Sequence, residues 1–138
     1  MDISHKTFVK TGGGTYLFAG TAHLLVELLY NTSENLKLQA YLNAYEFKLL
    51  DAHYSLYNFH TGYSMSMAIL LMFIGLLCLT ITVLDKEIIG TLCLGAIALC
   101  IVYFKYSILI PQLLMCIALL AFMLAYWSYV KMKPENAN

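Results

Sequence analysis

Four long apolar runs are the feature that most constrains the fold of this chain. They cover residues 14–30, 63–84, 88–104 and 107–130. Because an α-helix rises about 1.5 Å per residue, roughly 20 apolar residues cross a hydrocarbon core about 30 Å thick. The sequence therefore predicts an all-α integral membrane protein, a bundle of four transmembrane helices that forms a single domain over residues 1–138.

The composition fits a chain that lives in a bilayer. Of the 138 residues, 61% are hydrophobic and 12% are charged, whereas soluble domains carry about 25% charged residues. The formal net charge is zero, and no basic stripe is present to follow a phosphate backbone, which disfavours nucleic-acid binding. All four cysteines lie in predicted spans without a C-x-x-C motif, so we expect them to pack rather than to form a redox pair; they are Cys78, Cys93, Cys100 and Cys116.

The segments outside the apolar runs predict loops and topology. Residues 1–13 are polar and lead into three consecutive glycines, Gly12 to Gly14, which predict a flexible start to the first helix. In residues 31–62, apolar side chains recur at spacings near three, four and seven. That spacing predicts an extramembrane amphipathic helix, or a broken pair, that lies on the membrane surface or caps the bundle.

Lysine counts predict the orientation. Four spans place both termini on one side, and that side carries five lysines against three on the other. The positive-inside rule therefore predicts that both termini are cytoplasmic and that the 31–62 loop lies on the outer side.

One pair of ionisable residues lies within a predicted span. His23 and Glu27 are four apart on the first helix and share a face. An ionisable side chain at a helix centre in the membrane costs about 2.5–3.5 kcal/mol, which makes it a functional candidate. The pair predicts either a proton-carrying or metal-binding site that faces a cavity, or a hydrogen bond that fixes the first helix against its neighbours.

A second candidate site lies in the loop. If that stretch is helical, His53, Tyr57 and His60 share one face at the outer mouth of the bundle. Together with His23, the two loop histidines could bind zinc, copper or haem iron. Their spacing matches no compact metal motif, and histidines that only line the membrane interface would look the same. The sequence therefore names no cofactor.

Small residues on the third span predict close helix packing. Thr91 and Gly95 are four apart, and small residues at that spacing let membrane helices approach closely. The approach could occur within one chain or between copies.

Two short stretches carry a resemblance to a known family. Residues 17–24 read LFAGTAHL, and residues 55–65 read SLYNFHTGYSM. Together they resemble a family of small, functionally uncharacterised four-helix bacterial inner-membrane proteins, and the similarity extends over about residues 11–84. The resemblance implies a bacterial inner (plasma) membrane location, no defined activity, and a functional or packing role for Gly20, His23, Gly62 and Ser64.

Besides a membrane-embedded enzyme that acts on lipid, three kinds of function remain open at this point. No nucleophile elbow or phosphate loop is present, so we lean away from an enzyme. The first hypothesis is an accessory or scaffold subunit that forms a homo-oligomer or joins a larger membrane complex. The second is a redox protein that binds haem, metal or quinone through the histidines. The third is a proton-coupled transporter or ion-conducting oligomer that uses Glu27 and His23.

Overall fold

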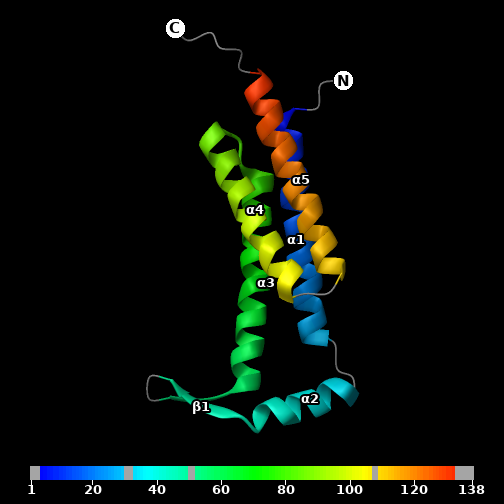
Figure 1. Ribbon diagram of the computed structural model, residues 1–138, viewed down its shortest axis with the longest axis vertical. Coiled ribbons are helices and arrows are strands. Elements are labelled where there is room, and N and C mark those ends of the chain that lie inside the picture. The colour runs from blue at the N-terminus through cyan, green and yellow to red at the C-terminus, as the bar shows by residue number, and fades with distance from the viewer. Residues whose placement is uncertain (1–3, 30–32, 50–51, 107–108, 133–138) are drawn as a thin grey trace. The chain divides into compact units, whose positions relative to one another are not determined.

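The computed structural model is mostly helical and describes residues 4–29, 33–49, 52–106 and 109–132. Along these ranges the chain forms α1 (His5–Leu29), α2 (Ser33–Asn43), β1 (Glu46–Leu49), β2 (Ala52–Ser55), α3 (Leu56–Thr80), α4 (Lys86–Tyr106) and α5 (Leu109–Met132) (Figure 1). Its contacts divide it into two compact units. The helical unit comprises Met1–Ala19 and Leu71–Asn138, and the hairpin unit comprises Gly20–Leu70.

Three helices are long and apolar enough to cross a membrane, judged by length and composition. They are Leu56–Thr80, Lys86–Lys105 and Leu109–Lys131, and they correspond to the second, third and fourth predicted spans. Helix α1 covers nearly all of the first predicted span, residues 14–30, but does not belong to this set. Its mean hydropathy is lowered by polar residues that include His23 and Glu27.

Helix α1 also begins earlier than the sequence predicts. It starts at His5, so Gly12 and Gly13 lie inside a regular helix, and the expectation of a flexible start is wrong. Both glycines are buried. A Cβ on Gly12 would lie 2.6 Å from the Phe122 ring. Close packing of this kind overrides the weak intrinsic preference of glycine for a helix.

The connection between α1 and α3 differs most from expectation. The predicted amphipathic helix, or broken pair, over residues 31–62 is wrong in its middle part, because α2 ends at Asn43 and an antiparallel hairpin follows. Residues 31–32 and 50–51 of this segment lie outside the described residues. Phe47 pairs with Tyr54 across the two strands, with ring centroids 6.2 Å apart. Aromatic side chains favour strands and stabilise them through such cross-strand pairs.

Side-chain caps set the starts of two of the long apolar helices, α3 and α4. Ser55 Oγ accepts a hydrogen bond from the backbone N–H of Asn58 at 3.1 Å, which caps α3 seven residues before the predicted start at residue 63. Asp85 Oδ1 accepts one from Ile88 N–H at 2.8 Å at the start of α4. Capping satisfies backbone donors that have no partner inside the helix.

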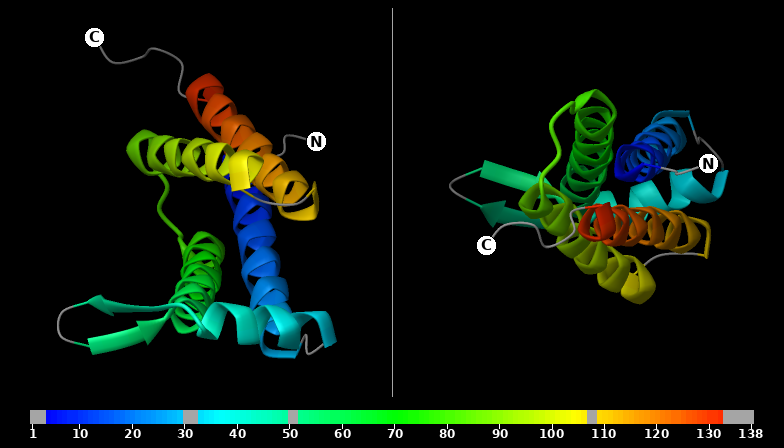
Figure 2. Two further views of the ribbon diagram at one scale, coloured as in Figure 1. Left: turned by 60° about the horizontal axis from the view of Figure 1, so that its bottom comes forward. Right: turned by 90° about the horizontal axis from the view of Figure 1, so that it is seen from above.

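Helices α4 and α5 lie side by side and run antiparallel in the helical unit (Figures 1 and 2). The core of this unit is built around side chains that are almost fully buried, including Val9, Ile89, Met115 and Phe122. By contrast, Leu94 is 70% exposed and Ile101 is 65% exposed. Helices that present such residues outward are typical of a protein whose surroundings are themselves apolar.

Candidate functional site

A hydrogen-bonded network of three polar side chains joins α1 to α3 inside the hairpin unit. Ser64 Oγ donates to Glu27 Oε2 at 3.1 Å. His23 Nε2 lies 2.8 Å from the same Ser64 oxygen. A hydroxyl carries one proton, so while Ser64 donates to Glu27 it must accept from His23. The geometry therefore requires a proton on Nε2 of His23.

Helix geometry explains how the three residues meet. His23 and Glu27 are one turn apart on α1 and so present both side chains to one neighbour. Ser64 is the buried member, with 9% of its surface exposed, whereas Glu27 is half-buried and His23 is exposed. The network is therefore exposed at His23 and buried at its central member, Ser64.

The position of Ser64 along α3 places the network near one end of the apolar run. Helix α3 has 25 residues, which is about 37 Å of helix and longer than a hydrocarbon core of about 30 Å. The first turns carry Asn58, His60 and Thr61, which suit a headgroup region. Ser64 lies about 12 Å from the first residue of α3, where the polar turns give way to apolar ones.

The sequence predicted the His23–Glu27 pair but missed how it is connected. The structure supplies a bridge through Ser64 instead of a direct bond between the two. The sequence analysis assigned Ser64 a role only through the family resemblance. A serine four residues from His60 and 37 residues from Glu27 carries no spacing signal that links it to α1.

The other predicted histidine site does not come together. His53 lies on β2 opposite Lys48, while Tyr57 and His60 lie on α3, so the three do not share a helical face. His53 and His60 are both exposed. In the part of the chain that the structure describes, no three His, Cys, Asp or Glu side chains are placed to hold a metal ion, His23, His53 and His60 included.

Two of the predicted packing glycines, Gly62 and Gly95, make no close helix contact. A Cβ on Gly62 or on Gly95 would meet no atom within 4 Å, and Thr91 Oγ1 instead bonds the Glu87 carbonyl at 2.9 Å. Gly20 is buried in α1, in agreement with a packing role. The tight approach in the helical unit lies at Gly75, where a Cβ would lie 2.6 Å from backbone atoms of α1.

The hydrogen-bond directions of the network differ from those of a serine-hydrolase triad. In a serine-hydrolase triad the imidazole Nε2 takes the serine proton and the carboxylate orients Nδ1. Here the Ser64 proton points to the Glu27 carboxylate, and Nε2 of His23 is a donor. The order His–Ser–Glu can hold a proton, pass it along, or fix two helices together.

Comparison with known proteins adds no identity. No protein-family model, curated protein or solved structure matches this chain. Function must therefore be inferred from the geometry of the structure and from the sequence.

Proposed function

We propose that this protein is a membrane-embedded accessory or scaffold subunit that docks another polypeptide through α2 and the β1–β2 hairpin. The observation that carries the proposal is apolar exposure on elements too short to cross a bilayer. Helix α2 has 11 residues, about 16 Å of helix, and each strand has four. The exposed apolar side chains, which we call the docking surface, are Leu36, Leu38, Tyr41, Tyr45 and Tyr54.

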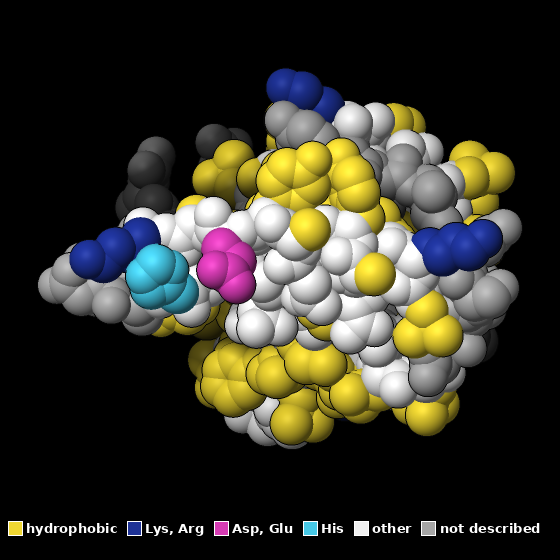
Figure 3. Space-filling model, turned by 90° about the horizontal axis from the view of Figure 1, so that it is seen from below, with side chains coloured by type: hydrophobic (Ala, Val, Ile, Leu, Met, Phe, Trp, Pro, Cys, Tyr) yellow, Lys and Arg dark blue, Asp and Glu magenta, His cyan; other side chains and the backbone are white. Residues whose placement is uncertain are grey.

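The docking surface cannot be attributed to spanning helices. Leu38 is 54% exposed and Tyr41 is 61% exposed. Figure 3 shows apolar side chains together with scattered charged ones on one face of the molecule. Exposed apolar patches rimmed by polar residues are typical of protein or membrane interaction sites.

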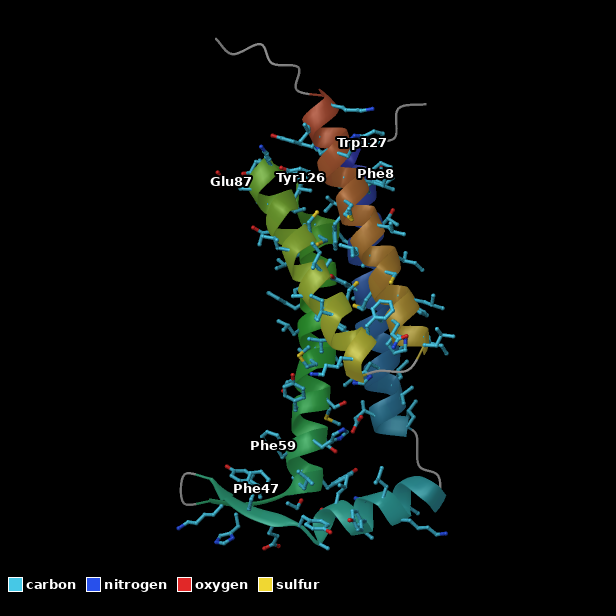
Figure 4. The ribbon with its side chains drawn as sticks, viewed as in Figure 1. Phe8, Phe47, Phe59, Glu87, Tyr126 and Trp127 are labelled. Atoms are coloured by element: carbon cyan, nitrogen blue, oxygen red, sulfur yellow. The ribbon has the colours of Figure 1, made fainter. Side chains whose placement is uncertain are left out.

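Aromatic contacts hold this surface in a defined shape. The Phe47 ring of β1 packs edge-to-face against Phe59 of α3, with centroids 5.6 Å apart (Figure 4). Tyr41 and Tyr45 share a hydroxyl hydrogen bond of 2.9 Å between the end of α2 and the start of the hairpin. A surface held by packed aromatic rings loses less conformational entropy when it binds.

The same proposal includes the membrane arrangement. We propose that α1 is a fourth spanning helix, that both termini are cytoplasmic, and that the protein resides in a bacterial plasma membrane, in line with the family resemblance. The network supports this, because Ser64 satisfies both His23 and Glu27 and so lowers the cost of placing ionisable groups in α1 within the bilayer.

Native mass spectrometry of the protein extracted in mild detergent tests the docking proposal. We expect discrete complexes with a second polypeptide or with further copies of the chain. Leu38→Glu should dissociate them, because it places a charge in the docking surface, whereas Lys37→Glu on the neighbouring exposed position should not. A spectrum that contains only the monomer, or complexes that persist in Leu38→Glu, would contradict the proposal.

The network favours a second candidate, a proton-coupled transporter or ion-conducting oligomer. A chain of donors and acceptors from exposed His23 to half-buried Glu27 could carry a proton. Proton flux into liposomes loaded with a pH-sensitive dye tests it, and Glu27→Gln should abolish the flux. The redox alternative has less support, because His53 and His60 lie on separate elements.

A further inference from the structure

A cavity in the helical unit carries an inference that does not depend on the proposed function. It has a volume of about 380 Å³ and lies between α1, α3 and α4. Its walls are almost wholly apolar and include Ile74, Leu92 and Leu99. This volume falls in the range of about 300–1,000 Å³ that is typical of small-molecule sites.

One polar side chain in the wall of this cavity has no partner. Tyr16 lines the cavity and is 2% exposed. Its hydroxyl oxygen is buried and makes no hydrogen bond to any residue that the structure describes. The other hydroxyl of the wall is already used, because Thr91 donates to the Glu87 carbonyl at 2.9 Å. Buried polar groups nearly always have a partner, so an orphan at a cavity wall points to a ligand atom.

Packing holds the Tyr16 ring in position. The ring lies edge-to-face on Phe122, with centroids 5.5 Å apart. Phe122 is itself fully buried and packs directly against Gly12. A phenol held this way offers one O–H donor at a defined point in an otherwise apolar site.

We infer that this cavity binds a membrane-soluble molecule with an apolar body and one carbonyl oxygen, which accepts a hydrogen bond from Tyr16. The apolar walls exclude charged ligands, because an unpaired charge there would be desolvated without compensation. The donor at Tyr16 selects an acceptor, which both a quinone ring and an ester lipid provide.

Binding of defined probes in detergent, read by native mass spectrometry, tests this inference. The probes are decylubiquinone, ethyl decanoate and decylbenzene, which share a ten-carbon chain and differ in the acceptor. We expect saturable one-to-one binding of at least one carbonyl probe, and weaker binding of decylbenzene. Preference for decylubiquinone would identify a quinone site, and preference for the ester a lipid site.

Two variants separate the donor from the cavity. Tyr16→Phe keeps the ring and should weaken the carbonyl probe about fivefold, the effect of one hydrogen bond, without affecting decylbenzene. Gly95→Leu should abolish binding of every probe, because Gly95 lines the cavity and a Cβ there meets open space. Gly14→Leu is the matched control, with open space outside the cavity.

Two results would overturn the inference. One is the absence of saturable binding for both carbonyl probes. The other is binding that decylbenzene matches and that Tyr16→Phe and Gly95→Leu leave unchanged.

Discussion

Gly75 of α3 lies directly against the backbone of α1 at Gly13. A Cβ on Gly75 would lie 2.6 Å from the Gly13 carbonyl oxygen and 2.6 Å from the backbone nitrogen of Leu17. Real Cβ atoms do not approach backbone atoms so closely, so only glycine permits this contact. The helical unit therefore depends on a close approach of two helix backbones at Gly75 and Gly13, where neither residue has a side chain.

Gly75→Ala should destabilise the protein by about 1–3 kcal/mol, because the added methyl group forces α1 and α3 apart. The midpoint of unfolding in a titration of mixed micelles with SDS measures the change. Gly14→Ala is the control one residue from Gly13, since its Cβ meets nothing within 4 Å. Equal midpoints for the two variants would show that the close approach does not exist.

Ser64→Ala should cost about 1–3 kcal/mol, since it leaves Glu27 without its donor and His23 without its acceptor. The same unfolding titration applies. Ser66→Ala is the matched control on α3, because Ser66 Oγ bonds only the Gly62 carbonyl of its own helix, at 2.7 Å. If Ser66→Ala lowered the free energy of unfolding as much as Ser64→Ala, the bridge between α1 and α3 would not contribute to stability.

The three members of the network should act as a unit. We expect His23→Ala and Ser64→Ala to be non-additive, with a coupling free energy of about 0.5–3 kcal/mol. A double-mutant cycle on the unfolding free energy measures it. The comparison pair is Ser66→Ala with His60→Ala, which should add within about 0.5 kcal/mol, because Ser66 Oγ bonds the Gly62 carbonyl and not His60. Additive costs for His23 and Ser64 would mean that the two side chains do not interact.

Tyr45 should lose its proton at higher pH than an ordinary tyrosine, whose pKa is 10.0, because the hydrogen bond with Tyr41 raises the pKa of Tyr45. Its folded pKa exceeds the unfolded one, so any stability from this contact is fully present below the unfolded pKa and is lost as pH rises through the folded pKa.

An NMR titration with ¹³Cζ-labelled tyrosine measures this pKa, and Tyr45→Phe assigns the signal. Tyr41→Phe should return the pKa of Tyr45 toward its ordinary value. Tyr54→Phe should not, because the Tyr54 ring packs against Phe47 instead. An identical Tyr45 titration with and without Tyr41 would rule out the hydrogen bond.

Much of the helical unit follows from apolar run length. The spans predicted at 88–104 and 107–130 differ by two residues at each end from α4 and α5. The agreement is close because the length of an uninterrupted apolar stretch sets the length of a helix that can cross a bilayer. The span at 63–84 was less accurate. Its helix begins at Leu56, where the Ser55 cap and the hairpin set the start.

The hairpin shows where sequence patterns become ambiguous. Aromatic and aliphatic residues in 31–62 satisfy spacings near three, four and seven, yet Phe47 and Tyr54 also fit the alternation of two short strands. Local spacing alone does not separate these alternatives in segments of four residues. The choice depends on cross-strand pairing and on the contact of Phe47 with Phe59.

The sequence by itself determined the apolar helices that can cross a membrane and the shared face of His23 and Glu27, because both depend only on helical rise and periodicity. Only the tertiary structure decided that Ser64 joins that pair, that Gly75 meets α1, and that Tyr16 lines a cavity while its hydroxyl has no partner among the described residues. Those relationships depend on how each helix is rotated and shifted against the next. That rotation is determined by packing contacts among side chains that are far apart in the sequence.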